Sequence, residues 1–169
     1  MAQKARIWRG LQQMNSPSGS DANASHLRGL KVLIVDDSRT VRTSAENMLH
    51  SAGCEVATAA DGFEALAKVA DLSPDIIFVD VMMPRLDGYE TCVLIKNNQQ
   101  FKKIPIIMLS SKDGLFDIAR GRICGAEQYL TKPFGREDLL TAITNFASPQ
   151  GPVTEPAQAR ESNTGPITR

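Results

Sequence analysis

Asp75-Ile-Ile-Phe-Val-Asp80 is the stretch of this 169-residue chain that decides the fold. Four consecutive apolar residues between two carboxylates are typical of a short strand buried on both faces, as in a parallel sheet. Pro84 cannot donate a hydrogen bond to a strand ladder, so the strand is expected to end before it. Asp80 is thereby placed at the carboxyl end of a buried strand, where open α/β sheets bind their ligands.

Apolar runs of similar length recur along the chain and alternate with segments of helical periodicity. The helix after the second strand is expected to bury Phe63, Leu66, Ala67 and Ala70. Right-handed crossovers leave such an alternation few arrangements, which predicts an α/β fold with a doubly wound, five-stranded parallel sheet of order 2-1-3-4-5. The predicted strands are 31–36, 54–58, 75–80, 104–110 and 127–130, and the predicted helices are 39–52, 61–70, 88–97, 115–124 and 137–146.

The two ends of the chain differ in composition from this periodic region. Residues 1–29 are expected to form a flexible leader, because Asn15 to Ser25 is dominated by small and polar residues. Its first part interleaves Lys4, Arg6 and Arg9 with apolar residues, a pattern that could fold against a partner or an anionic membrane surface, or simply remain disordered. Residues 148–169 are expected to be a disordered, Pro-rich tail, which leaves 30–147 as the one folded domain.

Composition excludes several classes of function. The formal net charge is zero, which argues against a protein that grips nucleic acid through its phosphates. The three cysteines are isolated, odd in number and lack metal-ligand spacing, so reduced thiols are expected rather than disulfides or a zinc site. No apolar run approaches the roughly 18 residues of a membrane span, and the N-terminus lacks a signal-peptide pattern. A cytoplasmic location is therefore expected.

Three carboxylates are expected to converge at the carboxyl edge of the sheet. In the order 2-1-3-4-5 the first and third strands are neighbours, and their ends carry Asp36, Asp37 and Asp80. Uncompensated, these groups would repel one another and raise at least one pKa. A hard cation with oxygen ligands would relieve the repulsion, and Mg²⁺ fits best. The bland alternative is that one of the first two carboxylates merely caps the helix starting near Ser38.

Two further strand ends point to the same crevice. Ser110 ends the fourth strand, and Lys132 follows the fifth. Each alone is ordinary, since a serine there is commonly a turn residue and a loop lysine is commonly solvated. Together they predict a site with metal-bound carboxylates on one side, a hydroxyl and an ammonium on the other, and room for a phosphoryl group between them. Phosphoryl transfer chiefly needs positioning and charge neutralisation, which such a site would supply.

Four stretches resemble the successive motifs of two-component response regulator receiver domains. They are Lys31-Val-Leu-Ile-Val-Asp-Asp37, Ile76-Ile-Phe-Val-Asp80 with Met82-Met-Pro-Arg-Leu-Asp-Gly88, Ile106-Ile-Met-Leu-Ser-Ser111, and Tyr129-Leu-Thr-Lys-Pro-Phe134. The resemblance covers about residues 30–147 and implies the flavodoxin-like receiver fold. Within that family, residues 88–98, 110–116 and 125–130 most resemble the PilG-type regulators of type IV pilus twitching motility.

The resemblance implies a role for each residue of the crevice. Asp80 matches the phosphoacceptor, which attacks a phosphohistidine or a small acyl phosphate. Asp37, Asp80 and the backbone carbonyl of Met82 match the Mg²⁺ ligands, with Asp36 assisting through a water. The phosphoryl-binding and switch residues that match are Lys132, Ser110 and Tyr129. The peptide bond between Lys132 and Pro133 is a candidate for the cis form.

The expected function is that of a single-domain response regulator in a phosphorelay, a phosphoacceptor switch rather than an enzyme, with self-catalysed phosphotransfer and autodephosphorylation. The expected partners are a histidine kinase of chemotaxis type and an output protein of the pilus machinery or its regulators. A phosphate-sink receiver without its own output is the open alternative. Two other classes of protein fit the sequence poorly. A phosphatase of the haloacid dehalogenase type would need an Asp where this chain has Met82, and a flavin-binding protein of similar topology would have its flavin phosphate repelled by Asp36 and Asp37.

Overall fold

A five-stranded parallel sheet forms the centre of the protein, and its strand order β2-β1-β3-β4-β5 confirms the predicted order. The computed structural model describes residues 27–111 and 123–147. The strands are β1 (Lys31–Val35), β2 (Glu55–Ala59), β3 (Ile76–Asp80), β4 (Ile106–Ser110) and β5 (Gln128–Thr131). The helices are α3 (Arg39–His50), α4 (Gly62–Leu72), α5 (Gly88–Asn97) and α7 (Arg136–Phe146).

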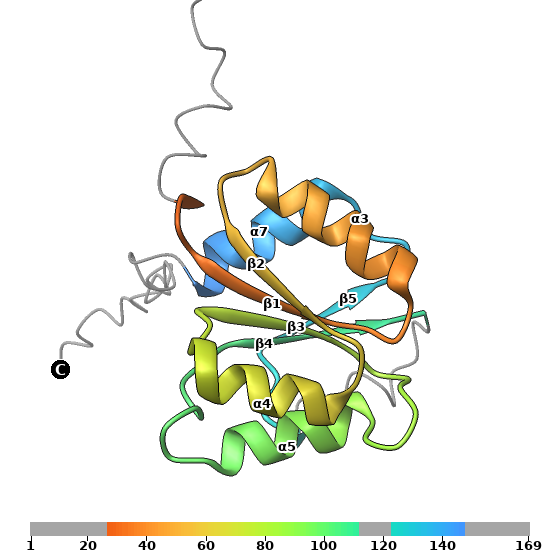
Figure 1. The fold of residues 1–169 in the computed structure, drawn as a ribbon, viewed down its shortest axis with the longest axis vertical. Helices are drawn as coiled ribbons and strands as arrows, with labels where there is room; N and C mark the ends of the chain where they lie inside the picture. The colour runs from red at the N-terminus through yellow and green to blue at the C-terminus, as the bar shows by residue number, and fades with distance from the viewer. Residues whose placement is uncertain (1–26, 112–122, 148–169) are drawn as a thin grey trace, which may run out of the picture.

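Helices cover both faces of the sheet. Figure 1 shows α3 and α7 on one face and α4 and α5 on the other. Each face has its own apolar cluster: Leu33 and Ile77 belong to the cluster that includes residues of α4 and α5, whereas Ile34 and Phe78 belong to the one that includes residues of α3 and α7. Alternate residues of one strand therefore serve opposite layers, as the pleat requires.

β3 lies at the centre of the sheet, and all five of its residues are buried. Val35 at the end of β1 pairs with Val79, so Asp36 comes beside Asp80. On the other side, Asp80 pairs with Leu109, and Ser110 follows. The register therefore brings the polar ends of β1, β3 and β4 together at one edge, as strand order alone predicted.

The predicted buried face of α4 is wrong. Phe63 is 56% exposed, Ala67 and Ala70 are exposed as well, and the residues that face the core are Ala65 and Val69. Leu66 is partly buried, as expected. The spacing of the apolar residues in this helix is compatible with two neighbouring faces, and the prediction took the wrong one. Gly62 marks the true face, since a Cβ there would collide with Thr91 of α5.

Every predicted strand differs from the observed one by one or two residues: β1 ends one residue earlier, β2 is shifted by one residue, and β3 begins one residue later. β4 begins at Ile106 rather than at residue 104, because the Ile104 N–H donates to the Phe101 carbonyl in a turn (2.9 Å) and Pro105 has no N–H to give. β5 is shifted by one residue, to Gln128–Thr131. Most of the helix predicted at 115–124 lies outside the described residues.

The packed part of the chain begins before residue 30. Leu27 is 3% exposed and belongs to the cluster beneath α3 and α7. The Gly29 N–H donates to the Gly53 carbonyl (3.0 Å), and the Leu30 N–H donates to the Leu27 carbonyl (3.3 Å). The last residues of the expected leader are thus part of the folded unit.

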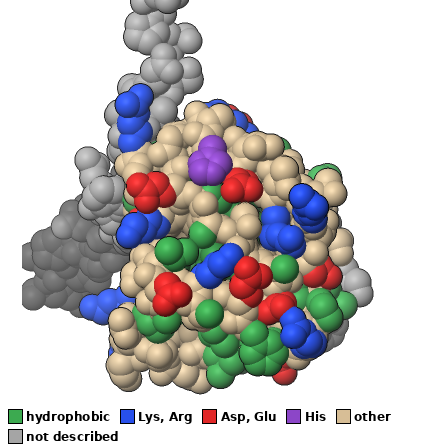
Figure 2. All heavy atoms as spheres, viewed as in Figure 1, with side chains coloured by type: hydrophobic (Ala, Val, Ile, Leu, Met, Phe, Trp, Pro, Cys, Tyr) green, Lys and Arg blue, Asp and Glu red, His purple; other side chains and the backbone are tan. Residues whose placement is uncertain are grey.

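The surface carries both signs of charge. On the face in Figure 2, basic side chains are interspersed with acidic ones, and apolar side chains gather on the side where α4 and α5 lie in Figure 1. Phe63 of α4 and Leu94 of α5 are among the exposed large apolar residues. Within residues 27–111 and 123–147, no helix has the length and apolar character needed to span a lipid bilayer.

Candidate functional site

Two carboxylates extend from the end of β1 in different environments. Asp36 is fully buried, and its Oδ1 accepts from the Ser38 N–H (2.9 Å). Asp37 is exposed. The Ser38 side chain caps α3 by accepting from the Val41 N–H (3.4 Å), so capping does not consume the carboxylate of Asp37. The alternative, that one of the two aspartates merely caps the helix, therefore does not apply to Asp37, because Ser38 supplies the N-cap side chain.

Asp80 is a buried carboxylate at the end of β3, 5% exposed. Burial raises its pKa, and the charge of Asp36 adds to that effect. The ammonium of Lys132 and the backbone N–H of Met82 act in the opposite direction, because both favour the ionised form. On balance the pKa of Asp80 is raised, so ionising this carboxyl group costs more free energy in the folded protein than in water.

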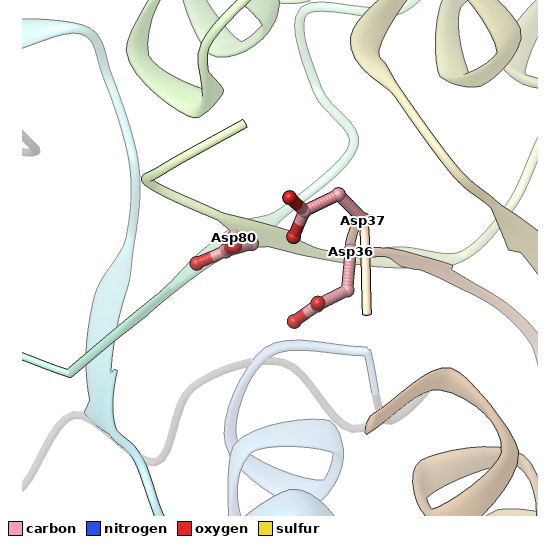
Figure 3. A group of neighbouring side chains, drawn as sticks. All are labelled: Asp36, Asp37 and Asp80. Carbon is pink, nitrogen blue, oxygen red and sulfur yellow. The ribbon is translucent and has the colours of Figure 1, made fainter. Parts of the chain in front are cut away.

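The three carboxylates form one cluster, as the sequence predicted. One oxygen each from Asp36, Asp37 and Asp80 can be chosen so that all lie within 4.8 Å of one another. Figure 3 shows Asp36 and Asp37 reaching from the end of β1 toward Asp80 at the end of β3. Three oxygen donors at this separation, two of them buried, match the ligand chemistry of a hard divalent cation.

Lys132 completes the charged centre from the end of β5. Its Nζ lies 2.5 Å from Asp36 Oδ2 and 3.1 Å from Asp80 Oδ1. Burial disfavours the ammonium, but the hydrogen bond and charge of Asp36, together with Asp80, outweigh burial and raise the pKa of Lys132. Its backbone N–H donates to the Ser110 carbonyl (2.6 Å), which ties the loop to β4. The bond between Lys132 and Pro133 is cis, as predicted.

The remaining predicted residues lie around this centre at different depths. Ser110 is 2% exposed at the end of β4 and pairs with Thr131, the residue before Lys132. Tyr129 pairs with Met108 and is partly buried against the cluster on the α4 and α5 side. The Met82 side chain is 64% exposed, and its backbone N–H bonds the Asp80 carboxylate.

Two residues that position the site were not found by sequence reasoning. A Cβ on Gly88 would collide with the carbonyl oxygen of Asp80, so this glycine lets α5 begin directly against the end of β3. The guanidinium of Arg42 donates to the carbonyls of Asp36 (2.6 Å) and Asp37 (3.2 Å), which fixes the backbone that carries both carboxylates. Two signals for Gly88 were available in the sequence, since it stands at a predicted helix start and ends the motif Met82-Met-Pro-Arg-Leu-Asp-Gly88.

A groove of about 440 Å³ opens beside Lys132, between α3 and the loop after β5. Its lining is mostly apolar or hydroxylated and includes Thr40, Val41, Ser44 and Phe134. Lys132 is the residue of the charged centre that lines this groove.

A doubly wound sheet with an acidic cluster and a lysine at its carboxyl edge defines a phosphoacceptor signalling domain. The chain belongs to the response regulator receiver domain family, whose family model matches residues 32–144. Receiver domains are the phosphoacceptor part of two-component signalling systems. The predicted family is thereby confirmed.

Among curated proteins, the chain is 68% identical over 115 residues to protein PilG of Pseudomonas aeruginosa. The alignment covers 68% of this chain and 85% of PilG. Several other curated relatives are longer: the chain spans 62% of a response regulator MprA of Mycobacterium and 46% of the regulatory protein PhoP of Bacillus subtilis.

Solved structures agree with this family. The chemotaxis protein CheY4 of Vibrio cholerae is 40% identical with a TM-score of 0.68, over 70% of this chain and 98% of that one. The receiver domain of a sensor histidine kinase of Pseudomonas aeruginosa, solved with a magnesium ion coordinated in its active-site cleft, is 31% identical with a TM-score of 0.66. That match covers 70% of this chain and 98% of the other.

Proposed function

We propose that this protein is a single-domain response regulator that accepts a phosphoryl group on Asp80 from a histidine kinase of chemotaxis type. The observation that carries the proposal is the contact of Asp80 with Lys132 (3.1 Å) inside a cluster of three carboxylates. Asp80 is the carboxylate of that cluster on the central strand, and it shares the lysine ammonium with Asp36. Such an arrangement suits a group that must be nucleophilic and then carry added negative charge.

The transfer begins when an oxygen of ionised Asp80 attacks the phosphorus of a phosphohistidine. The new O–P bond forms as the P–N bond breaks, and the imidazole leaves. Lys132 assists by keeping Asp80 ionised against its burial, and its ammonium then pairs with a phosphoryl oxygen. Small acyl phosphates would transfer by the same attack, with a carboxylate as the leaving group. Water attacking the aspartyl phosphate would later restore Asp80.

The donor set fits Mg²⁺, and we infer that Asp37, Asp80 and the backbone carbonyl of Met82 hold it, with Asp36 assisting through a water. The Asp37 carboxylate is exposed, so a cation from solvent can reach it directly. Asp36 is fully buried, and its oxygens already accept hydrogen bonds from Lys132 and Ser38. When bound, the ion would neutralise charge on the phosphoryl oxygens. Mg²⁺ keeps several waters and binds through a few carboxylates, which suits a half-open cluster of this kind.

Phosphorylation would then act through local charge. A phosphoryl group adds about two negative charges, and Ser110 and Lys132 are the donors placed to respond. Movement of the Ser110 hydroxyl toward the phosphoryl oxygens would vacate the space that it occupies at the end of β4. The side chain of Tyr129 on the adjacent strand β5 would then change its rotamer in response. The face built on β5 and α7 is therefore the proposed output surface.

The sequence similarity guides the proposed pathway. The identity of 68% over 85% of PilG supports a shared role in type IV pilus twitching motility and chemosensory signalling. The partners would be a chemotaxis-type kinase, docking along the groove beside Lys132, and an output protein of the pilus machinery or its regulators. We assign the receiver to residues 30–147, extended by the packed residues 27–29 of the predicted leader 1–29, with a tail at 148–169, and place the protein in the cytoplasm.

The phosphoacceptor assignment can be tested with acetyl phosphate and intact-mass spectrometry, with Mg²⁺ or with EDTA. We expect one phosphoryl adduct that requires Mg²⁺ and is absent from Asp80→Ala. An adduct that persists in Asp80→Ala, or forms equally well in EDTA, would refute the assignment.

A phosphate sink is the second candidate, because it needs the same site residues and no output surface. Pull-downs with the phosphorylated and unphosphorylated forms separate the two roles. A partner other than the kinase that binds one form alone supports an output regulator. Capture of the kinase as the sole phosphorylation-dependent partner would favour the sink.

A further inference from the structure

Two cysteines that lie 32 positions apart in the sequence meet on the α5 side of the sheet. The Cys92 Sγ in α5 lies 3.3 Å from the Cys124 carbonyl oxygen, and the two thiol side chains are hydrogen-bonded to each other. Cys92 is fully buried, whereas Cys124 is 6% exposed and stands next to Ile123, which is 86% exposed. Neither cysteine forms a disulfide in the structure.

The two thiols differ in their ionisation. The hydrogen bond with Cys124 raises the pKa of Cys92, and burial adds to the effect, so its proton is retained. The same hydrogen bond lowers the pKa of Cys124 to about 7 against the effect of its burial, helped by backbone N–H groups and by the charge of Lys96. The pair thus shares one hydrogen bond between a thiol and a thiolate, and Cys124 is the member that an oxidant from solvent meets first, because it is the more exposed of the two.

The backbone around the pair is already held in place by polar contacts. Lys96, one turn after Cys92, donates from Nζ to the Ile104 carbonyl (2.8 Å) and pairs with Glu127 (2.6 Å). Glu127 in turn accepts from the Ile106 N–H (2.6 Å). These contacts join α5 to the start of β4 and to the entry of β5, just after each cysteine in the sequence, and so keep the backbone segments that carry Cys92 and Cys124 next to each other.

We propose that Cys92 and Cys124 are a modification site, a thiol pair that closes to an intramolecular disulfide when the protein meets a peroxide. The proposal does not depend on the phosphoryl chemistry at Asp80. The disulfide would link α5, which starts at Gly88 against Asp80, to the approach of β5, the strand that leads to Lys132. Oxidation would thus stiffen a junction between two segments that support the carboxyl edge.

The oxidation balances with hydrogen peroxide as the electron acceptor. The Cys124 thiolate attacks one peroxide oxygen, the O–O bond breaks, and hydroxide leaves, which gives a sulfenic acid at Cys124. The Cys92 sulfur then attacks the Cys124 sulfur, the S–O bond breaks, and water leaves with the Cys92 proton. Overall two thiols and one peroxide give one disulfide and two waters.

The experiment treats the full chain with hydrogen peroxide at neutral pH, followed by alkylation under denaturing conditions and peptide mapping. We expect the three free thiols to fall to one, with Cys92 linked to Cys124 and recovery of both by dithiothreitol. Cys54 is the matched internal control, because it is also buried (4% exposed), its pKa is raised by burial, and it lies in the other core cluster. We expect the Cys54 thiol to react with peroxide at least about 10-fold more slowly than the Cys92–Cys124 pair.

Two single variants test the order of events. In Cys92→Ser, Cys124 should stop at a sulfenic acid that dimedone traps, whereas in Cys124→Ser the Cys92 thiol should remain unmodified. Cys54→Ser should form the disulfide at the wild-type rate. Three alkylatable thiols after peroxide, or a disulfide that involves Cys54 or a second chain, would overturn the proposal. Wild-type peptide mapping alone decides these outcomes if a serine variant does not fold.

Discussion

Asp75 and Asp80 bracket the same strand and differ in almost every physical respect. Asp75, before β3, is exposed, and its carboxylate accepts from the backbone N–H of Lys31 (2.8 Å) at the edge where the strands begin. Asp80, at the other end, is 5% exposed and has two carboxylates and an ammonium for neighbours. One residue type therefore makes a peripheral strand contact at one edge and a charged centre at the other.

The difference arises from strand polarity and register rather than from residue type. In a parallel sheet all the carboxyl ends meet, and the central position of β3 places Asp80 between the ends of β1 and β4. Burial then makes each nearby charge effective, because fewer water molecules screen it. Asp75 is screened by solvent, so a substitution there is the natural control for one at Asp80.

The largest effect is expected from Asp80→Asn. The amide keeps the size of the side chain but is not a nucleophile, so labelling by acetyl phosphate should fall to background. Asp75→Asn keeps an oxygen that can accept from Lys31 and should label at the wild-type rate. Phosphoryl incorporation measured over time distinguishes the two, and equal labelling of both variants would contradict the assigned role of Asp80.

The next effect is expected from Lys132→Ala. Loss of the ammonium leaves Asp36 and Asp80 without their shared cation, so the initial rate of labelling should fall by about 100-fold. Lys68→Ala removes a lysine paired with Glu64 on the surface of α4 and should leave that rate unchanged. An initial labelling rate in Lys132→Ala within twofold of the wild-type rate would refute the role of Lys132 as the cation paired with Asp80.

Gly88→Ala tests the close approach of α5 to Asp80. The added methyl group meets the Asp80 carbonyl, so the free energy of unfolding should fall by about 1–3 kcal/mol, with slower labelling. Gly135→Ala at the start of α7 places its Cβ 3.6 Å from Asp138 and should cost less than about 1 kcal/mol. Urea unfolding measures both. Equal destabilisation by the two variants would show that the contact with Asp80 is unimportant.

Asp80→Asn should also stabilise the fold without Mg²⁺, with a definite pH dependence. The pKa of Asp80 is raised in the folded state, chiefly by burial and then by Asp36, so its ionisation opposes folding. The gain over wild type should be fully present above the raised pKa of folded Asp80 and shrink as pH falls through it, where wild-type Asp80 becomes protonated. Thermal unfolding in EDTA across this range provides the measurement. A gain that grows toward low pH would have the wrong sign.

Much of the fold follows from local patterns. Apolar runs located all five strands, and the order of the sheet followed from their alternation with helices. The buried face of α4 was mispredicted, because a helix of alanines and isolated larger residues offers two faces with similar periodicity. The direction of the neighbouring helix decides between them, and that direction is a tertiary property.

The candidate site divides in the same way. Asp36, Asp37 and Asp80 could be placed together because strand ends and strand order are visible in the sequence. Gly88 and Arg42 could not, since their roles depend on a close backbone approach and on a side chain that reaches back to its own strand end. The meeting of Cys92 and Cys124 likewise depends on how α5 packs, which no spacing encodes.

The most direct test of the central claim is to locate the phosphoryl group itself. The protein would be labelled with acetyl phosphate and Mg²⁺, reduced with borohydride to convert an aspartyl phosphate to homoserine, and sequenced by mass spectrometry. We expect homoserine at position 80 in wild type and Asp75→Asn, and at no position in Asp80→Asn. Homoserine at Asp36, Asp37 or Asp75, or unchanged labelling of Asp80→Asn, would contradict it.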